Sequence, residues 1–395
     1  ELYSWYLQSP EYRILVKKLT EASFSERPSD KIGKTVAKIL YGEISPYSAT
    51  RLERFAACAF AHFLQYGLKV TERAEYEFRA MDMGNVMHMA LEKFAAEVRK
   101  EGLDWAELTE EERNRIIDSC LDQVSADYGN TILKSSARNE YMIERTRRIL
   151  RRTVWALQEQ LKHGAFRPEG FEVRFQGGRI DRVDIMEEPE NNRVYVKVID
   201  YKTGNTSFDL LALYHGLQLQ LMVYLDGALQ VEKRKYPDRE IVPAGVFYYN
   251  VKDPMIQEKI HADMESINEQ MLKKMKMNGL VQADDNMSTK IDSTMASIPV
   301  SLNRDGSFSK RSSVASRKQF DALGAYVRRK ICDIRESILD GNAAVEPYEL
   351  GKKNACTYCP YLTVCGFDRK IPGYEFHRLS SIEEDALWKK IMKGE

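Results

Sequence analysis

Two segments of alternating apolar and polar residues restrict the folds open to this chain more than any other feature. They run from Gly178 to Asp184 (Gly-Arg-Ile-Asp-Arg-Val-Asp) and from Val198 to Gly204 (Val-Ile-Asp-Tyr-Lys-Thr-Gly), on either side of a polar turn at residues 187–192. A period of two with β-branched residues is typical of strands, and a polar turn between two such runs indicates an antiparallel hairpin. Because helical periodicity surrounds this region, we expect an α/β protein with a mixed central sheet flanked by helices.

The same patterns predict the neighbouring elements. In chain order they are strands at 171–176, 178–186 and 193–202, a helix at 211–231, a strand at 242–251, and helices at 256–279 and 317–341. Further upstream, a helix from Arg51 to Tyr66 is expected to contain Cys58. Thr50 and Glu53 have the spacing of a capping box, which would open that helix.

The strand pair carries a group of charged residues suited to phosphodiester chemistry. Residues two apart on a strand face the same side, so Asp200 and Lys202 project together, and the adjacent strand can bring Asp181 beside them. Carboxylates hold Mg²⁺ through hard oxygen ligands, the metal activates water, and an ammonium group stabilises charge on phosphate. The alternative is that these are ordinary solvent-facing charges of a hairpin.

Three further residues fit the same chemistry. His88 lies in a helical segment, where an imidazole is either a satisfied surface or core group or a metal ligand. Gln220 and Tyr224 are four residues apart, so they share one face of the helix that follows the third strand. Taken singly, each is an ordinary packing or capping residue; their order along the chain together with Asp181, Asp200 and Lys202 favours a common site.

With these residues the chain resembles the RecB-type branch of the PD-(D/E)XK nucleases. The resemblance implies a PD-(D/E)XK core with helical insertions. It also implies roles for individual residues: His88, Asp181 and Asp200 as Mg²⁺ ligands, Lys202 as the catalytic lysine, and Gln220 and Tyr224 as supporting active-site residues. Asp184 and Gln218 nearly duplicate Asp181 and Gln220, and the residues alone leave that choice open.

The cysteines suggest a second metal centre. Cys356, Cys359 and Cys365 form C-x2-C-x5-C, which provides three of the four thiolates that a structural zinc or an iron–sulfur cluster normally uses. The residues around Cys58 resemble the segment of iron–sulfur nucleases in which a cysteine before the nuclease core joins three after it. That resemblance implies a [4Fe–4S] cluster that staples a long loop of chain. Cys120 and Cys332 are expected to be small core residues.

Overall charge gives no indication of a nucleic-acid partner, because 59 basic residues balance 59 acidic ones. Local clusters are more informative. Arg147, Arg148, Arg151 and Arg152 lie on one helical stretch and are either solvated surface or a rim that tracks the phosphates of single-stranded DNA. Charged residues interrupt every apolar run before the roughly 20 residues that a membrane span needs, so we expect a soluble intracellular protein without a membrane partner. The resemblance implies a bacterial, cytoplasmic protein.

The resemblance also suggests how the chain is organised. The expected divisions are a tail of a preceding helicase-like domain at 1–45, a helical region at 46–170, the nuclease core at 171–280, a polar segment and helix at 281–345, and the cysteine cluster with a C-terminal tail at 346–395. The resemblance therefore implies that the chain is a piece of a longer protein. That protein would be one component of an AddAB-type helicase–nuclease with an AddA-like partner.

Such an enzyme processes DNA double-strand ends for recombinational repair, and this component would cut the 5′-terminated strand. The alternatives are a stand-alone RecB-like exonuclease of the CRISPR-associated type and a catalytically silent module that binds DNA ends.

Overall fold

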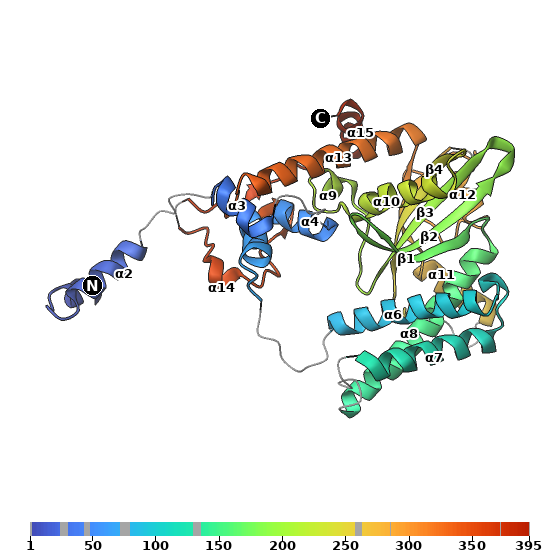
Figure 1. Cartoon of the computed structure of the whole chain (residues 1–395), viewed down its shortest axis with the longest axis horizontal. Coiled ribbons are helices and arrows are strands. Elements are labelled where there is room, and N and C mark those ends of the chain that lie inside the picture. Colours follow the sequence, from blue (N-terminus) through green and yellow to red (C-terminus); the bar gives the residue numbers. More distant parts are fainter. Residues whose placement is uncertain are drawn as a thin grey trace. The chain divides into compact units, whose positions relative to one another are not determined.

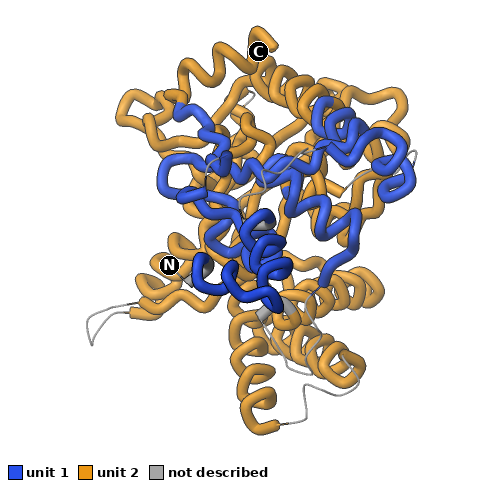
Figure 2. Tube along the Cα trace, turned by 90° about the vertical axis from the view of Figure 1, so that its left-hand side faces the viewer, with its two compact units in different colours: residues 1–45, 54–71, 333–381 blue, residues 46–53, 72–332, 382–395 orange. Residues whose placement is uncertain are grey.

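The computed structural model describes residues 2–23, 31–42, 48–71, 80–128, 136–256, 263–284, 286–371 and 373–394. The chain divides into two compact units, each built from separate stretches of sequence (Figure 2). Unit 1 comprises residues 1–45, 54–71 and 333–381, and unit 2 comprises residues 46–53, 72–332 and 382–395. Within the described ranges, no helix has both the length and the apolar character needed to span a membrane.

Unit 2 is built on a six-stranded mixed sheet whose strands follow one another in chain order. The strands are β1 (Arg167–Phe175), β2 (Gly178–Glu188), β3 (Arg193–Lys202), β4 (Glu240–Asn250), β5 (Asn278–Gln282) and β6 (Val314–Ala315). The pairs β1–β2, β2–β3 and β4–β5 are antiparallel, whereas β3–β4 and β5–β6 are parallel. β3 and β4 are buried along almost their whole length, as central strands covered on both faces should be.

Helices cover both faces of this sheet (Figure 1). α9 (Leu210–Tyr214) and α10 (Gln220–Lys235) connect β3 to β4, and α10 packs on one face. On the other face, α6 (Ala80–Lys100), α7 (Glu110–Asp127) and α8 (Ala137–Lys162) share one apolar core with alternate residues of the strands. The expected α/β fold, a mixed sheet flanked by helices, is confirmed.

The remaining elements are shorter or lie at the edges of the units. In unit 2 they are the 3-10 turns η2 (Trp105–Glu107) and η4 (Pro189–Asn191), and the helices α11 (Met264–Lys274), α12 (Met287–Ile291) and α15 (Glu384–Lys393). In unit 1 they are α1 (Leu2–Leu7), α2 (Arg13–Ser23), α3 (Lys34–Tyr41), α5 (Ala59–His62), the π-helical turn η1 (Phe63–Gly67), α14 (Leu362–Cys365), and the strands β7 (Tyr348–Leu350), β8 (Lys353–Asn354) and β9 (His377–Arg378). The boundary between the units falls within α4 (Ala49–Ala57) and α13 (Arg317–Leu339).

Two helix predictions were wrong in ways that glycine explains. The helix expected at 211–231 is split into α9 and α10 by Gly216, whose φ of 80° ends a helical turn. The helix expected at 256–279 ends with α11, and β5 has begun by Gly279. A side chain at Gly279 would lie 1.9 Å from the carbonyl oxygen of Val246, so only glycine allows β5 to approach β4 this closely. Residues 257–262 of that prediction lie outside the described residues.

The helix expected from Arg51 to Tyr66 is interrupted at Cys58. This residue has φ −168° and ψ 114°, an extended conformation that separates α4 from α5. The backbone N–H of Phe60 donates to the carbonyl of Ala344 instead of continuing the helix. The cysteine therefore sits at a break between two helices rather than within one.

Candidate active site

Two carboxylates of the predicted motif meet at one end of the sheet. Asp181 lies on β2 and Asp200 on β3, and the backbone N–H of Tyr201 donates to Oδ2 of Asp181 at 2.7 Å. Asp200 is only 2% exposed, and its Oδ2 lies 2.6 Å from Nζ of Lys202. The structure thus brings together the two acids and the lysine that strand alternation placed on one side.

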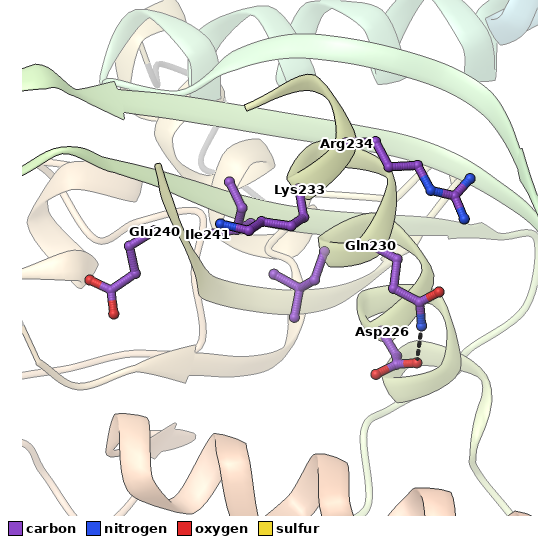
Figure 3. A pocket seen from close by; sticks show the side chains of 7 residues that line it. Asp226, Gln230, Lys233, Arg234, Glu240 and Ile241 are labelled. Carbon is purple, nitrogen blue, oxygen red and sulfur yellow. Dashed lines mark hydrogen bonds between the residues drawn. The ribbon is translucent and has the colours of Figure 1, made fainter. Parts of the chain in front are cut away.

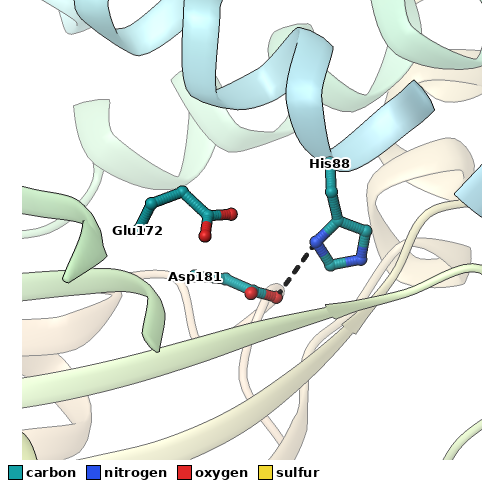
Figure 4. A group of neighbouring side chains, drawn as sticks. All are labelled: His88, Glu172 and Asp181. Carbon is teal, nitrogen blue, oxygen red and sulfur yellow. Dashed lines mark ion pairs between the residues drawn. The ribbon is translucent and has the colours of Figure 1, made fainter. Parts of the chain in front are cut away.

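A histidine and a third carboxylate complete this group (Figure 4). His88 reaches in from α6, with its Nδ1 3.4 Å from Oδ2 of Asp181. Glu172 on β1 points toward the same place, and potential ligand atoms of His88, Glu172 and Asp181 all lie within 4.8 Å of one another. An imidazole and two carboxylates in this arrangement suit a hard divalent cation.

Sequence reasoning missed Glu172, although a signal was present. A hairpin that closes between Phe175 and Gly178 puts Glu172 opposite Asp181 across the β1–β2 pair. Glu172 also has φ 50°, a left-handed conformation that costs a residue other than glycine about 1–3 kcal/mol. The hairpin register could have identified the residue, but the unusual backbone that accompanies it could not be read from the sequence.

The electrostatics of the group favour a bound cation. Burial, followed by the charge of Asp181, raises the pKa of Asp200 to about 6 even though Lys202 opposes the shift. Burial and Asp181 likewise raise the pKa of Glu172 to about 7. For His88, burial lowers the pKa, but the hydrogen bond and charge of Asp181 outweigh it and raise the pKa overall. The charge of Asp181 thus hinders the ionisation of Asp200 and Glu172, and a divalent ion held among these acids would relieve the repulsion.

Lys202 is held by the two supporting residues of the predicted motif. Its ammonium group donates to Oε1 of Gln220 at 2.7 Å, and Nε2 of Gln220 donates to the hydroxyl of Tyr224 at 2.8 Å. Gln220 is the first residue of α10, and Tyr224 lies one turn later. The ammonium therefore has a fixed position between Asp200 and Gln220.

The near-duplicate acid Asp184 lies elsewhere. It is fully buried and accepts from Nε and Nη2 of Arg182 at 2.6 and 2.9 Å, with Nζ of Lys197 at 3.0 Å. Asp184 is three residues from Asp181, so the two side chains leave opposite faces of β2. Asp184 belongs to a buried ion triad of Arg182, Asp184 and Lys197, apart from the candidate site.

The near-duplicate amide Gln218 supports a loop. Its Oε1 accepts from the backbone N–H of Asp209 at 2.7 Å, and its Nε2 donates to the carbonyl of Ser207 at 2.8 Å. These bonds fix the segment between β3 and α9, whereas Gln220 contacts Lys202.

The four arginines predicted to contact DNA lie on α8, and each is paired with an acidic side chain of unit 2. The pairs are Arg147–Asp122, Arg148–Asp253, Arg151–Asp118 and Arg152–Asp253. Pairing reduces the positive charge that these side chains offer to phosphate.

The four cysteines proposed to share a cluster line one small cavity in unit 1. They are Cys58, Cys356, Cys359 and Cys365, and all six cysteines of the chain are free of disulfide bonds. Burial, and then the neighbouring cysteines, raises the pKa of Cys356 to about 11, and burial raises that of Cys58. Nη2 of Arg54 lies 3.8 Å from Sγ of Cys359. Converging thiols with a positive charge beside them fit a thiolate-bound metal centre.

The two remaining cysteines differ from each other. Cys120 on α7 is 1% exposed, which confirms it as a core residue. Cys332 on α13 is exposed, so its assignment to the core was wrong.

A separate hollow of about 600 Å³ lies beside α10 and β4 (Figure 3). Its apolar lining comes from Leu229 and Ile241. Asp226 at its edge accepts from Gln230 at 2.8 Å, and Lys233 donates to nearby backbone carbonyls. None of the candidate catalytic residues lines this hollow.

Comparison with known proteins is consistent with this geometry. The family model described as "PD-(D/E)XK nuclease superfamily" matches residues 46–366. Proteins named as one component of an "ATP-dependent helicase/deoxyribonuclease" match the whole chain, with 40% identity over 415 residues in Lachnoclostridium phytofermentans, 35% over 419 in Alkaliphilus metalliredigens and 34% over 417 in Thermoanaerobacter sp.. The chain covers 36% of the length of each of these relatives.

Proposed function

This chain belongs to the PD-(D/E)XK nuclease superfamily, and from that premise we propose that it is a magnesium-dependent DNA exonuclease domain. The observation that carries the proposal is the grouping of His88, Asp181, Asp200 and Lys202 at one end of the sheet. Nucleases of this superfamily generally depend on divalent metals. His88, Asp181 and Asp200 would hold the ion, with Glu172 within reach of the first two.

Each side chain has a distinct task in this proposal. When bound, Mg²⁺ would supply a Lewis acid for the phosphate and lower the pKa of water. The ammonium of Lys202, fixed by Asp200 and Gln220, donates to a phosphate oxygen or orients the attacking water as negative charge develops. Tyr224 holds the amide of Gln220 so that its oxygen faces Lys202. Fixing the ammonium in advance spares the reaction the cost of ordering it.

Substitution of the acid and the lysine tests the proposal. Asp200→Asn and Lys202→Met should each abolish Mg²⁺-dependent cleavage of end-labelled single-stranded DNA, with thermal unfolding close to that of the unmodified protein. Lys310→Met, at an exposed position, is the matched control and should cut normally. Undiminished cutting by both site variants would refute the assignment.

The names of the relatives support a place for this domain in a larger enzyme. We infer that it is the nuclease part of an ATP-dependent helicase–nuclease with an AddA-like partner protein, which processes double-strand ends for recombinational repair in the bacterial cytoplasm. On this proposal it cuts the 5′-terminated strand. Duplexes labelled at either 5′ or 3′ ends, given to the complex with ATP, test the polarity. Equal activity of the chain with and without a motor protein would instead favour a stand-alone exonuclease.

We further propose that Cys58, Cys356, Cys359 and Cys365 hold a [4Fe–4S] cluster. Their convergence on one cavity supports a metal centre of four thiolates. A cluster joining residues so far apart in sequence would act as a staple, because metal binding contributes directly to folding. Anaerobic protein should be brown, with about four iron and four sulfide per chain. Stoichiometric zinc without iron would replace the cluster with a structural zinc site.

A further inference from the structure

A buried acid from outside the nuclease motif holds the start of α10. Glu53 lies on α4, and its Oε1 accepts from the backbone N–H groups of both Leu219 and Gln220, at 2.7 and 2.9 Å. The capping box predicted for Glu53 and Thr50 is therefore wrong: this carboxylate serves a helix 167 residues later in the chain. At the start of α4, the backbone N–H of Arg51 donates to the carbonyl of Ser48 instead.

The first N–H groups of α10 need such an acceptor. A helix leaves its first N–H groups unpaired, and a side chain at the N-cap position usually satisfies one of them. The N-cap of α10 is Leu219, which has no polar side chain and is fully buried. Unpaired N–H groups are costly in a buried position. Glu53 therefore supplies what the local sequence lacks.

The residue fixed in this way is the one that holds the catalytic lysine. The backbone N–H of Gln220 donates to Glu53, while the side-chain oxygen of Gln220 accepts from Lys202 at 2.7 Å. Lys202 in turn lies 2.6 Å from Asp200. A continuous series of short contacts thus runs from Glu53 through Gln220 and Lys202 to Asp200. Burial raises the pKa of Glu53 to about 7, and Oε1 can accept these bonds in either protonation state.

We infer that Glu53 is a positioning residue of the nuclease site, which sets the place of the Lys202 ammonium by anchoring the backbone of Gln220. This inference rests on the proposed nuclease function and adds to its site a residue of α4, a helix outside the sheet. Displacements of about 1 Å in a positioned group cost roughly 100-fold in rate. Loss of the anchor should therefore lower kcat by roughly 10- to 100-fold and leave the KM for DNA nearly unchanged.

Two substitutions separate anchoring from charge. Glu53→Ala removes the acceptor, whereas Glu53→Gln keeps an oxygen in place and removes only the charge. The expected result is a fall in kcat for Glu53→Ala and rescue by Glu53→Gln. If Glu53→Gln is as slow as Glu53→Ala while both remain folded, anchoring by hydrogen bonds is refuted.

A double-mutant cycle tests whether Glu53 affects kcat through Gln220. If Glu53 acts through Gln220, then Glu53→Ala combined with Gln220→Ala should be no slower than the slower single variant. Losses that multiply would show that Glu53 acts independently of Gln220 and would overturn the inference.

Hydrogen exchange tests the anchor without relying on cleavage. Amides in a peptide spanning residues 216–222 should exchange faster in Glu53→Ala, and at the original rate in Glu53→Gln. Unchanged exchange in Glu53→Ala would overturn the inference whether or not the chain cuts DNA. If exchange changes as expected but the unmodified protein does not cut DNA, the proposed function fails and the anchor stands.

Discussion

Asp181 and Asp184 look interchangeable in the sequence, and their substitution should separate function from stability. Asp184 is fully buried between Arg182 and Lys197, both of which are also almost inaccessible to solvent. The guanidinium of Arg182 is further enclosed by aromatic rings, with Trp105 centred 5.0 Å away. Asp184→Asn would keep the shape of the side chain but leave two buried cations without a counter-charge.

The structure sets the size of the expected effect. Removing one partner of a buried ion pair costs about 3–5 kcal/mol, because the remaining charge stays buried and uncompensated. Burial already lowers the pKa of Lys197, with the charge of Asp184 opposing the shift, so Lys197 can release its proton when Asp184 is neutralised. That response limits the loss, and we expect about 3 kcal/mol. At about 2 °C per kcal/mol for a domain of this size, Tm should fall by roughly 6 °C.

Urea and thermal unfolding, measured beside cleavage of single-stranded DNA, would check this prediction. Asp184→Asn should be less stable but still cut at temperatures where it is folded. Asp181→Asn is the matched variant, since its amide oxygen can still accept from Tyr201, and it relieves repulsion with Asp200. It should be as stable as the original protein and inactive. Normal stability with lost cleavage in Asp184→Asn would refute the separation of roles.

Three further results are expected. Glu172→Gln should weaken Mn²⁺ binding about tenfold in an electron paramagnetic resonance titration, or about 1.4 kcal/mol. The control Glu111→Gln, at an exposed position on α7, should leave Mn²⁺ binding unchanged, and equal affinities of the two variants would exclude Glu172 from the site. Because burial raises the pKa of Glu53 above its usual 4.5 to about 7, its contribution to stability is complete below pH 4.5 and is lost as the pH rises through 7. Urea unfolding from pH 4.5 to 8 should show a flatter profile for Glu53→Gln, and a profile parallel to the original would contradict this. Cys58→Ser should lose the bound metal and have a lower Tm, whereas Cys332→Ser, at an exposed position, should keep the metal content and the Tm of the original protein. Full metal content in Cys58→Ser would show that Cys58 is not a ligand.

The features that the sequence predicted well are those set by local periodicity. β2 and β3 begin and end close to the predicted residues, because alternation and β-branched residues between polar turns are typical of strands, although both faces of these two strands are buried. The shared face of Asp200 and Lys202 follows from the same geometry, and so does the placement of Gln220 and Tyr224 one helical turn apart. Each of these inferences needs only neighbouring residues.

The features that could not be predicted depend on contacts between distant segments. The partner of Glu53 lies 167 residues away, and a local capping motif gave an equally reasonable but wrong role. The extended backbone of Cys58 comes with a hydrogen bond from Phe60 to Ala344, far along the chain, rather than from its neighbours. In both cases tertiary contacts override what the local sequence alone indicates, a capping role for Glu53 and a helical backbone at Cys58.

Charge balance separates the structural carboxylates from the functional ones more clearly than burial does. Asp184 is the most deeply buried acid of the motif, yet two cations face it and its pKa falls despite its burial. Asp200 and Glu172 are also largely buried, and their pKa values rise through burial and the charge of Asp181, although Lys202 pairs with Asp200 and Arg179 with Glu172. Excess positive charge stabilises the ionised form of a buried carboxylate, whereas burial and a neighbouring acid destabilise the ionised forms of Asp200 and Glu172 until a further cation offsets their charge. The protein therefore tolerates an unfavourable arrangement of acids where a metal is expected, and surrounds an acid with two cations three residues away on the opposite face of the same strand.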